Sequence, residues 1–316
     1  MEKIKDDTTV AAADDTTTTT TTTGEGGQEG GGAVEIQDAE LMNRIKAFVN
    51  EHNNIATLVL LIPTYGFMCN VDFVISLMNT LQLLKTFEIQ VIIEFCKNDS
   101  LISRARNNLI AKAMAHENSE SKKITHFMFI DSDIIWNPWD ILKLMVADKE
   151  IIGGIYPKKK YYFERMLEDN FPKKILETKK DSFLKDMDDL SYLKCKLVDC
   201  NLNYLSNTIE IKNNHCQVRH LATGFMMIKR SLIEELQTIY PQMKYEDDCG
   251  FLNTKEQVHA YAFFNTEVSE GHFMSEDWYF CDLCRKQNKQ IFVDISINLC
   301  HVGQEYYSGS ILASLV

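Results

Sequence analysis

The run His126-Phe-Met-Phe-Ile-Asp-Ser-Asp133 is a short apolar stretch that ends in two aspartates. A stretch of this length favours a buried strand, and Asn137-Pro138 just after it is typical of a helix start. The carboxylates of Asp131 and Asp133, two residues apart in extended chain, point the same way. In a doubly wound sheet, ligands bind beyond the carboxyl ends of the strands, so we expect this pair at a binding edge.

Strand-like and helix-like segments alternate on both sides of this run. Apolar runs predict strands at 55–62, 89–95, 126–130, 151–156, 222–228 and 291–295. Apolar residues at helical spacing predict helices at 71–87, 100–114, 139–146, 231–237 and 276–287, with Ser100 capping the second of these. Such alternation is typical of an α/β fold, so we predict a single Rossmann-like domain with a mostly parallel central sheet flanked by helices.

The predicted domain occupies residues 55–316. Residues 1–33 are of low complexity, with a threonine run followed by Gly, Glu and Gln, so we expect a disordered tail there. Residues 34–54 have helical spacing and predict a leading helix that packs onto the fold. Lysine pairs and acidic clusters break the alternation at about 157–215, which we interpret as an insertion or acceptor-side segment.

The bulk composition excludes several classes of protein. Of the 316 residues, 45% are hydrophobic, and the net charge of -12 argues against nucleic acid or anionic lipid held by bulk charge. Nine cysteines, an odd number, favour reduced thiols, with Cys281 and Cys284 packing in a predicted helix. No apolar run reaches the roughly 18 residues of a membrane span, and no signal-peptide pattern is present. We therefore expect no transmembrane segment and a cytoplasmic location.

The aspartate pair predicts a cation and phosphate site. A nucleotide diphosphate carries several negative charges, which Mg²⁺ or Mn²⁺, held by one or two carboxylates, neutralises. Asp-x-Asp also occurs in ordinary surface turns, and its place directly after an apolar strand favours the functional interpretation over that one. Arg104 and Arg106 follow the second predicted strand, where arginine suits a diphosphate, although a surface ion pair is the more common role.

Three further positions have both a structural and a functional interpretation. Glu276 and Asp277 begin a predicted helix, where acids favour the positive helix end, but a carboxylate there is also a candidate general base. His301 is either structural or a metal ligand. Gly224 either allows close packing or lets the backbone approach a ligand.

Seven short motifs occur in a fixed order between residues 55 and 305: Ile62-Pro-Thr-Tyr-Gly66, Asn98-Asp-Ser-Leu-Ile-Ser-Arg-Ala-Arg-Asn107, Phe129-Ile-Asp-Ser-Asp133, Ile152-Gly-Gly-Ile-Tyr-Pro157, Ala222-Thr-Gly-Phe-Met-Met-Ile-Lys-Arg230, Ser275-Glu-Asp-Trp278 and His301-Val-Gly303. Together they resemble the family-2-like glycosyltransferases of GT-A fold, especially stand-alone enzymes of bacteriophages and large DNA viruses. For a viral protein, the expected cytoplasmic location would be the host cytosol or a viral factory.

The resemblance implies a metal-dependent transfer from a nucleotide-sugar donor, often a UDP-sugar, to a hydroxyl of a glycan or glycoprotein acceptor. The cofactor would be Mn²⁺ or Mg²⁺, and the acid-rich motif favours an inverting reaction. By position, the resemblance assigns Pro63, Thr64 and Tyr65 to the nucleobase and ribose. It assigns Asp131, Ser132, Gly224 and Arg104 to the donor. The metal would be bound by Asp133 with His301 and Asp131, and catalysis would fall to Asp277 with Glu276.

Three other functions fit parts of the pattern. A phosphatase-like hydrolase would use Asp131 as nucleophile and Asp133 as acid/base, but that motif normally follows the first strand, and here two strand–helix units precede it. A nucleotidyltransferase would need a Gly-rich, Arg-containing loop after the first strand, where Pro63-Thr-Tyr-Gly66 stands instead. A non-catalytic nucleotide-sugar-binding module would not require Asp277 or His301.

Overall fold

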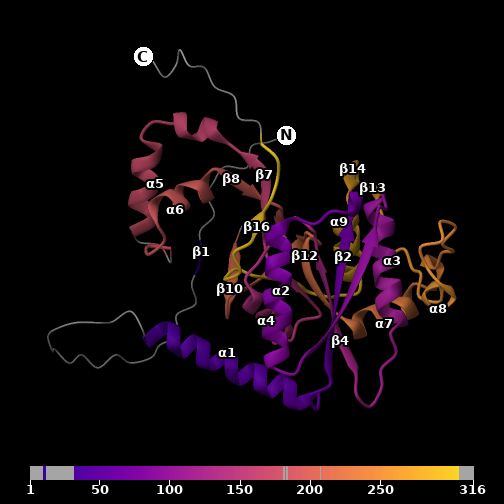
Figure 1. Ribbon diagram of the computed structural model, residues 1–316. Helices are drawn as coiled ribbons and strands as arrows, with labels where there is room; N and C mark the ends of the chain where they lie inside the picture. The colour runs from indigo at the N-terminus through magenta and orange to yellow at the C-terminus, as the bar shows by residue number, and fades with distance from the viewer. Residues whose placement is uncertain (1–9, 12–31, 181, 183, 207, 306–316) are drawn as a thin grey trace.

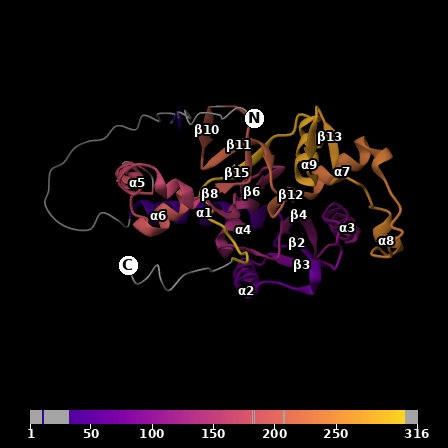
Figure 2. The ribbon, with the colours of Figure 1, turned by 90° about the horizontal axis from the view of Figure 1, so that it is seen from above.

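A computed structural model describes residues 10–11, 32–180, 182, 184–206 and 208–305. Its main feature is a ten-stranded mixed sheet flanked by helices on both faces (Figures 1 and 2), with the strand order β1-β10-β11-β15-β6-β12-β4-β2-β3 and β9 paired to β11. The strands are β1 (Val10–Ala11), β2 (Ala56–Thr64), β3 (Gln90–Lys97), β4 (Lys123–Ile130), β6 (Ile151–Gly153), β9 (Leu202–Tyr204), β10 (Ile209–Lys212), β11 (His215–Leu221), β12 (Phe225–Lys229) and β15 (Ile291–Asp294). The α/β fold class is therefore confirmed.

The helices connect these strands or form separate segments beside them. They are α1 (Gly32–Glu51), α2 (Val71–Thr86), α3 (Ile102–Ala115), α4 (Pro138–Met145), α5 (Phe171–Lys180), α6 (Asp189–Lys196), α7 (Arg230–Ile239), α8 (Thr254–Gln257) and α9 (Glu276–Arg285), with 3₁₀ turns η1 (Tyr65–Phe67), η2 (Phe163–Leu167) and η3 (Pro241–Met243). The predicted leading helix is present as α1, whereas the predicted disordered tail lies almost wholly outside the described residues. No described helix has the length and apolar character needed to cross a membrane.

The sheet is mixed, so the prediction of a mostly parallel sheet holds only for part of it. Strands β2, β3 and β4 are parallel, as are β6 and β15, but β12 runs antiparallel to both β4 and β6, and β11 runs antiparallel to β15. The direction of β12 follows from its connection. The chain enters β12 from β11 through residues 222–224 and keeps the direction of β11, which is opposite to that of β15 and β6.

Two local predictions are also corrected. Ser100 does not cap α3: the N-cap is Leu101, and the Asp99 carboxylate accepts the Leu101 N–H at 3.0 Å. The strand predicted at 222–228 begins only at Phe225, and β11, which precedes it, was not predicted. By contrast, the Asn137 cap of α4 is confirmed and forms a full capping box.

The segment 157–215 contains its own small elements. The hairpin-like pair β7 (Pro157–Tyr161) and β8 (Val198–Cys200) encloses η2, α5 and α6, which Figure 1 shows beside the central sheet. Two other short pairs are β5 (Ile134–Ile135) with β16 (Cys300–His301), and β13 (Glu267–Ser269) with β14 (His272–Met274). Pairing of β5 with β16 brings the end of the described chain next to the loop that follows β4.

The core consists of two apolar clusters, one on each face of the sheet. Helices α3, α7 and α9 cover one face, and α1, α2 and α4 cover the other. Strand β2 supplies residues to both clusters and is buried along its whole length. Apolar burial contributes about 25 cal/mol per Å², so packing on both faces stabilises β2 strongly. The end of β2, next to which a site can form, is therefore held in place.

Asn107 is a polar residue inside this core. Its side-chain amide donates to the carbonyl of Phe264 and accepts the Phe264 N–H, both at 2.8 Å, and it is only 5% exposed. It thereby joins α3 to the loop that precedes β13. This amide therefore pairs both backbone groups of Phe264, which water does not reach. A buried backbone group left without a partner costs about 1–3 kcal/mol.

We predict that Asn107→Ala destabilises the protein by about 2 kcal/mol or more, because it leaves both backbone groups of Phe264 unpaired. Urea unfolding followed by circular dichroism measures the change. Asn43→Ala on the exposed face of α1 is the matched control and should leave the midpoint unchanged. Equal midpoints for both variants would contradict this role.

Candidate functional site

A pocket of about 440 Å³ lies at the carboxyl ends of β2, β3 and β4. Seven of the candidate site residues singled out in the sequence line it: Pro63, Thr64, Tyr65, Arg106, Asp131, Ser132 and Asp133. They meet there because β2 is hydrogen-bonded in parallel to both neighbours, so that the three strands end at the same edge. The Thr64 hydroxyl donates to the Cys96 carbonyl at 3.0 Å, which ties two of these strand ends together, while the Tyr65 ring is 70% exposed at the rim.

The main chain of the aspartate loop is held by three separate segments. The Asp131 N–H donates to the Gly224 carbonyl at 3.0 Å, the Asn70 N–H donates to the Ser132 carbonyl at 3.0 Å, and the Val302 N–H donates to the Asp133 carbonyl at 2.8 Å. These partners come from the turn before β12, the start of α2 and the end of β16. The loop is therefore a fixed platform for its two carboxylates.

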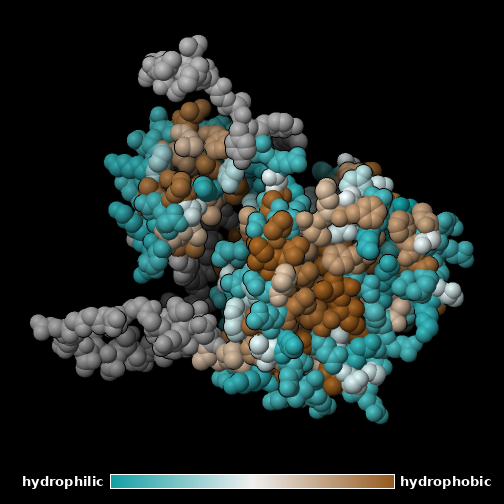
Figure 3. Space-filling view, viewed as in Figure 1, coloured by the Kyte–Doolittle hydropathy of each residue, from teal (hydrophilic) through white to brown (hydrophobic). Residues whose placement is uncertain are grey.

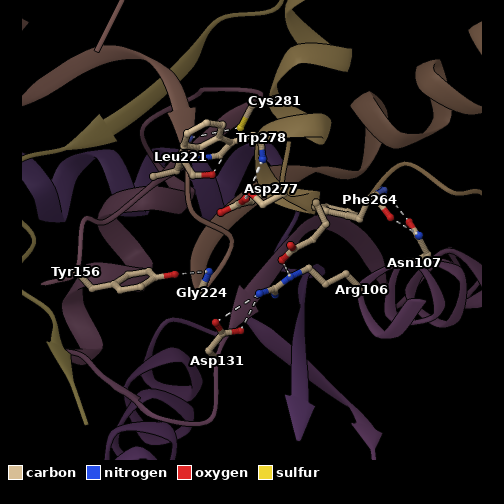
Figure 4. Close-up of polar contacts among 12 residues, drawn as sticks. Arg106, Asn107, Asp131, Tyr156, Leu221, Gly224, Phe264, Asp277, Trp278 and Cys281 are labelled. Carbon is tan, nitrogen blue, oxygen red and sulfur yellow. Dashed lines mark hydrogen bonds and ion pairs between the residues drawn. The ribbon is translucent and has the colours of Figure 1, made fainter. Parts of the chain in front are cut away.

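Arg106 links the aspartate loop to the start of α9. Its Nη2 donates to Asp131 at 3.2 Å and its Nε donates to Glu276 at 3.1 Å (Figure 4), and the side chain is almost fully buried. Burial opposes the charge, but the two carboxylates outweigh it and raise the pKa of Arg106 above its ordinary value. The buried Nη1 has no hydrogen-bond partner among the described residues. That free donor fits an anionic ligand oxygen.

Gly224 allows the turn before β12 to approach the loop closely. A Cβ added to it would lie 2.5 Å from the Tyr156 Oη and 2.8 Å from an Asp131 carboxylate oxygen, so no other residue fits without a shift. The Gly224 N–H donates to the Tyr156 Oη at 3.2 Å. Burial, together with the charge of Asp131, raises the pKa of Tyr156, and its hydroxyl therefore stays protonated at neutral pH.

Asp133 faces different partners from Asp131. Lys159 of β7 donates to its Oδ2, and the Nε2 of His301 lies 3.5 Å from its Oδ1. Burial alone would raise the pKa of Asp133, but His301 and Lys159 outweigh burial and hold it at about 2. Both carboxylates of the Asp-x-Asp pair thus have a cationic side chain of the protein beside them.

The donor set around Asp133 fits a divalent cation. The Nδ1 of His301 lies 2.9 Å from the Pro157 carbonyl, which only accepts, so Nδ1 donates to it and the ring turns its Nε2 toward Asp133. This is the orientation that metal-binding histidines adopt. Within the described ranges no three His, Cys, Asp or Glu side chains gather closely enough to hold a metal. One carboxylate and one imidazole would therefore need ligand oxygens to complete the shell, as Mg²⁺ and Mn²⁺ sites commonly do.

Asp277 lies in the first turn of α9 and is 7% exposed. Its Oδ1 accepts the Ser275 hydroxyl proton and, at 2.9 Å, the Trp278 N–H, so Ser275 does not serve as a side-chain cap. Burial raises the pKa of Asp277 and the charge of Glu276 adds to the rise, against the lowering effect of Ser275 and Arg106. Neither Asp277 nor Glu276 lines the pocket itself, and Arg106 is the lining residue that joins them to it. A carboxylate with a raised pKa is suited to accept a proton.

Arg104 lies apart from this group. Its guanidinium forms two hydrogen bonds with Asp99, at 2.7 and 2.9 Å, and stacks over the Phe251 ring. Asp99 and Arg106 line the pocket, whereas Arg104 does not. The donor-binding role expected for Arg104 stays a prediction, and the arginine that the structure places against Asp131 is Arg106.

Sequence reasoning missed Tyr156 and Lys159 as site residues and did not place Arg106. Arg106 had a signal, because it belongs to an Arg-x-Arg pair in which helical geometry turns the two side chains to different faces. Tyr156 ended a predicted strand and Lys159 stood in a lysine run, so neither differed from an ordinary structural residue. No model of a known protein family matches the chain, and no curated protein matches it.

We predict that Asp277→Asn raises the melting temperature at neutral pH. A carboxyl whose pKa is raised on folding contributes stability at low pH, which is lost as the pH rises through the folded-state pKa. The asparagine keeps the acceptor oxygen for Ser275 and Trp278 but carries no charge. The difference between variant and wild type, followed by calorimetry from acid to neutral pH, should therefore grow with pH. A constant difference would contradict the assignment.

Proposed function

We propose that this protein is a metal-dependent glycosyltransferase of GT-A type that uses a nucleotide-sugar donor, with a UDP-sugar as the first candidate. The observation that carries the proposal is the Arg106 bridge between Asp131 and Glu276. It brings the Asp-x-Asp loop and the acidic start of α9 to one pocket edge although 145 residues separate them. A diphosphate site and a candidate base beside each other are what glycosyl transfer to a hydroxyl needs.

The donor would lie along the pocket from the rim to the aspartate loop. Tyr65 at the exposed rim offers a ring for the nucleobase, and Pro63 and Thr64 form the wall beneath it. Arg106, with its free Nη1, would face the sugar or the diphosphate. The absence of a side chain at Gly224 lets this turn lie directly against Asp131 and Tyr156, so that its backbone would border the transferred sugar.

Asp133 and His301 would hold Mn²⁺ or Mg²⁺ together with the diphosphate oxygens. The ion, when bound, would supply the positive charge that stabilises the departing nucleoside diphosphate. Lys159 contacts Asp133 from β7, so its ammonium group lies where it can also pair with a phosphate oxygen. Arg106 pairs with Asp131 and orients it, which separates the role of Asp131 from that of Asp133.

Asp277 would act as the base that takes the proton of the acceptor hydroxyl. Ser275 and Trp278 hold one of its carboxylate oxygens, which fixes the direction of the other. Figure 4 shows Asp277, Gly224 and Arg106 around the same space. Direct attack by an acceptor activated in this way would invert the anomeric carbon. Glu276, which is bonded to Arg106, would position that arginine rather than take the proton.

We predict that UDP-sugar with Mn²⁺ raises the melting temperature and that Asp133→Ala abolishes the metal-dependent part of the rise. A ligand at 100 times its Kd stabilises a protein by about 2.7 kcal/mol, which thermal denaturation detects readily. Asp169→Ala, at an exposed aspartate of the 157–215 segment, is the control and should retain the full shift. The absence of a shift with UDP-, GDP- and dTDP-sugars, together with phosphate release from simple phosphoesters, would favour the hydrolase instead.

We predict that Asp277→Asn lowers kcat by roughly 10²–10⁴-fold while the KM for the donor stays within a few-fold, because the base acts on the acceptor. The measurement is steady-state release of nucleoside diphosphate with a panel of glycan acceptors. Glu276→Gln should change the donor KM as well, since it loosens Arg106. Retention of kcat by Asp277→Asn would show that the base is a different group.

A further inference from the structure

The outer side of β3 and α2 is an exposed apolar surface. On α2 the exposed side chains Val71, Val74, Ile75 and Met78 recur at helical spacing, with Val71 73% and Met78 64% exposed. Figure 2 shows α2 and β3 on the same side of the molecule, and Figure 3 shows apolar side chains gathered on that face. Because a monomer rarely exposes a continuous apolar surface of this kind, the face is a candidate interface.

Strand β3 is the last strand of the sheet, and no described element pairs with its outer edge. It has eight residues and contains no proline. Its ladder to β2 shows no register shift, so no bulge turns the edge away. Proteins normally protect such an edge with a bulge, a proline or inward charges, because it is a template for another strand. Of the two charged residues of this strand, Lys97 stands at its end, and Glu94 in its middle is paired with His116 at 2.7 Å.

Four charged residues mark the two ends of this face. Since β2, α2 and β3 form a crossover unit with parallel strands, α2 runs opposite to β3. Asp72 and Lys97 therefore lie near one end, and Lys85 and Glu88 near the other. All four are exposed, and none forms an ion pair with another described residue. Each end therefore carries one acidic and one basic residue. On α2 the acid is at one end and the base at the other, and on β3 and the residue before it the order is reversed.

We propose that this face, made of β3 and the outer side of α2, binds a second copy of the chain about a two-fold axis. Two β3 edges would pair antiparallel and join the two sheets, and the two α2 helices would pack side by side. The rotation brings Asp72 of each copy to Lys85 of the other, and Lys97 to Glu88. A parallel arrangement would instead bring like charges together, so the charge pattern selects the antiparallel dimer.

The side chains of β3 also select the register. Val91, Ile93 and Phe95 lie on the α2 side of the strand, whereas Ile92 lies on the α3 side. Pairing centred on Ile93 places Ile93 opposite itself and Val91 opposite Phe95, so that only apolar side chains meet on the α2 side. Centring one residue later would place Glu94 opposite Glu94 of the other copy, and like charges in that position are destabilising.

Analytical ultracentrifugation of the full chain tests the proposal. The wild type should sediment at twice 36.4 kDa at micromolar concentration. Met78→Glu should give monomers with an unchanged circular dichroism spectrum, and Met166→Glu, an exposed methionine in η2, should stay dimeric. A monomeric wild type overturns the proposal, because a different partner would then cover the face. A dimeric Met78→Glu variant overturns it as well.

A charge exchange separates the proposed contact from a general effect on folding. Asp72→Lys should weaken the dimer about tenfold or more, because it meets Lys85 of the other copy. Adding Lys85→Asp to the same chain should restore the wild-type dissociation constant. Failure of the double variant to recover would contradict the antiparallel arrangement.

Disulfide trapping tests the register. Ile93→Cys should give a covalent dimer under mild oxidation, because the two introduced cysteines face each other across the two-fold axis. Val91→Cys is the matched control: its partner position is Phe95, so the two introduced cysteines lie several residues apart and should form no covalent dimer above the wild-type background. Trapping of Val91→Cys instead of Ile93→Cys would overturn the register.

Discussion

The buried guanidinium of Arg106 is the interaction on which the organisation of the site depends. A charge removed from water is costly, and this one is offset by two carboxylates, Asp131 and Glu276, that lie far apart in sequence. Each of the three side chains requires the other two. The sheet brings the end of β4 to this position, and Arg106 fixes the start of α9 against it.

This arrangement separates the two aspartates of one short motif. Asp131 turns toward Arg106 and the turn at Gly224, whereas Asp133 turns toward Lys159 and His301. In an extended strand they would point the same way, as the sequence suggested. The chain bends after β4 instead, where the main-chain carbonyl of Asp131 accepts the Ile134 N–H at 3.0 Å. The bend places the Asp131 carboxylate beside the buried Arg106 and the Asp133 carboxylate beside Lys159 and His301.

Hydrophobic periodicity predicted those parts of the fold in which local pattern and position agree. Strands β2 and β4 and helix α4 were found because apolar runs and an Asn-Pro cap are local signals. The direction of β12 was not predictable in that way, since it depends on the strands with which β12 pairs and on the preceding strand β11, which was not predicted. The pocket residues after β2 and β4 followed from the strand ends. Arg106 and Lys159 did not, because their roles depend on partners 25 and 26 residues away in sequence, respectively.

The 157–215 segment is joined to the site at both ends. It leaves the sheet directly after Tyr156, whose hydroxyl accepts the Gly224 N–H, and returns through β11 to that same turn. Its first residue, Pro157, provides the carbonyl that orients His301, and Lys159 two residues later contacts Asp133. A displacement of α5 and α6 relative to the sheet would therefore change the partners of Asp133 before it changed those of Asp131, which Arg106 holds independently. The segment that is least regular in sequence is thus the one connected most directly to the proposed metal ligands.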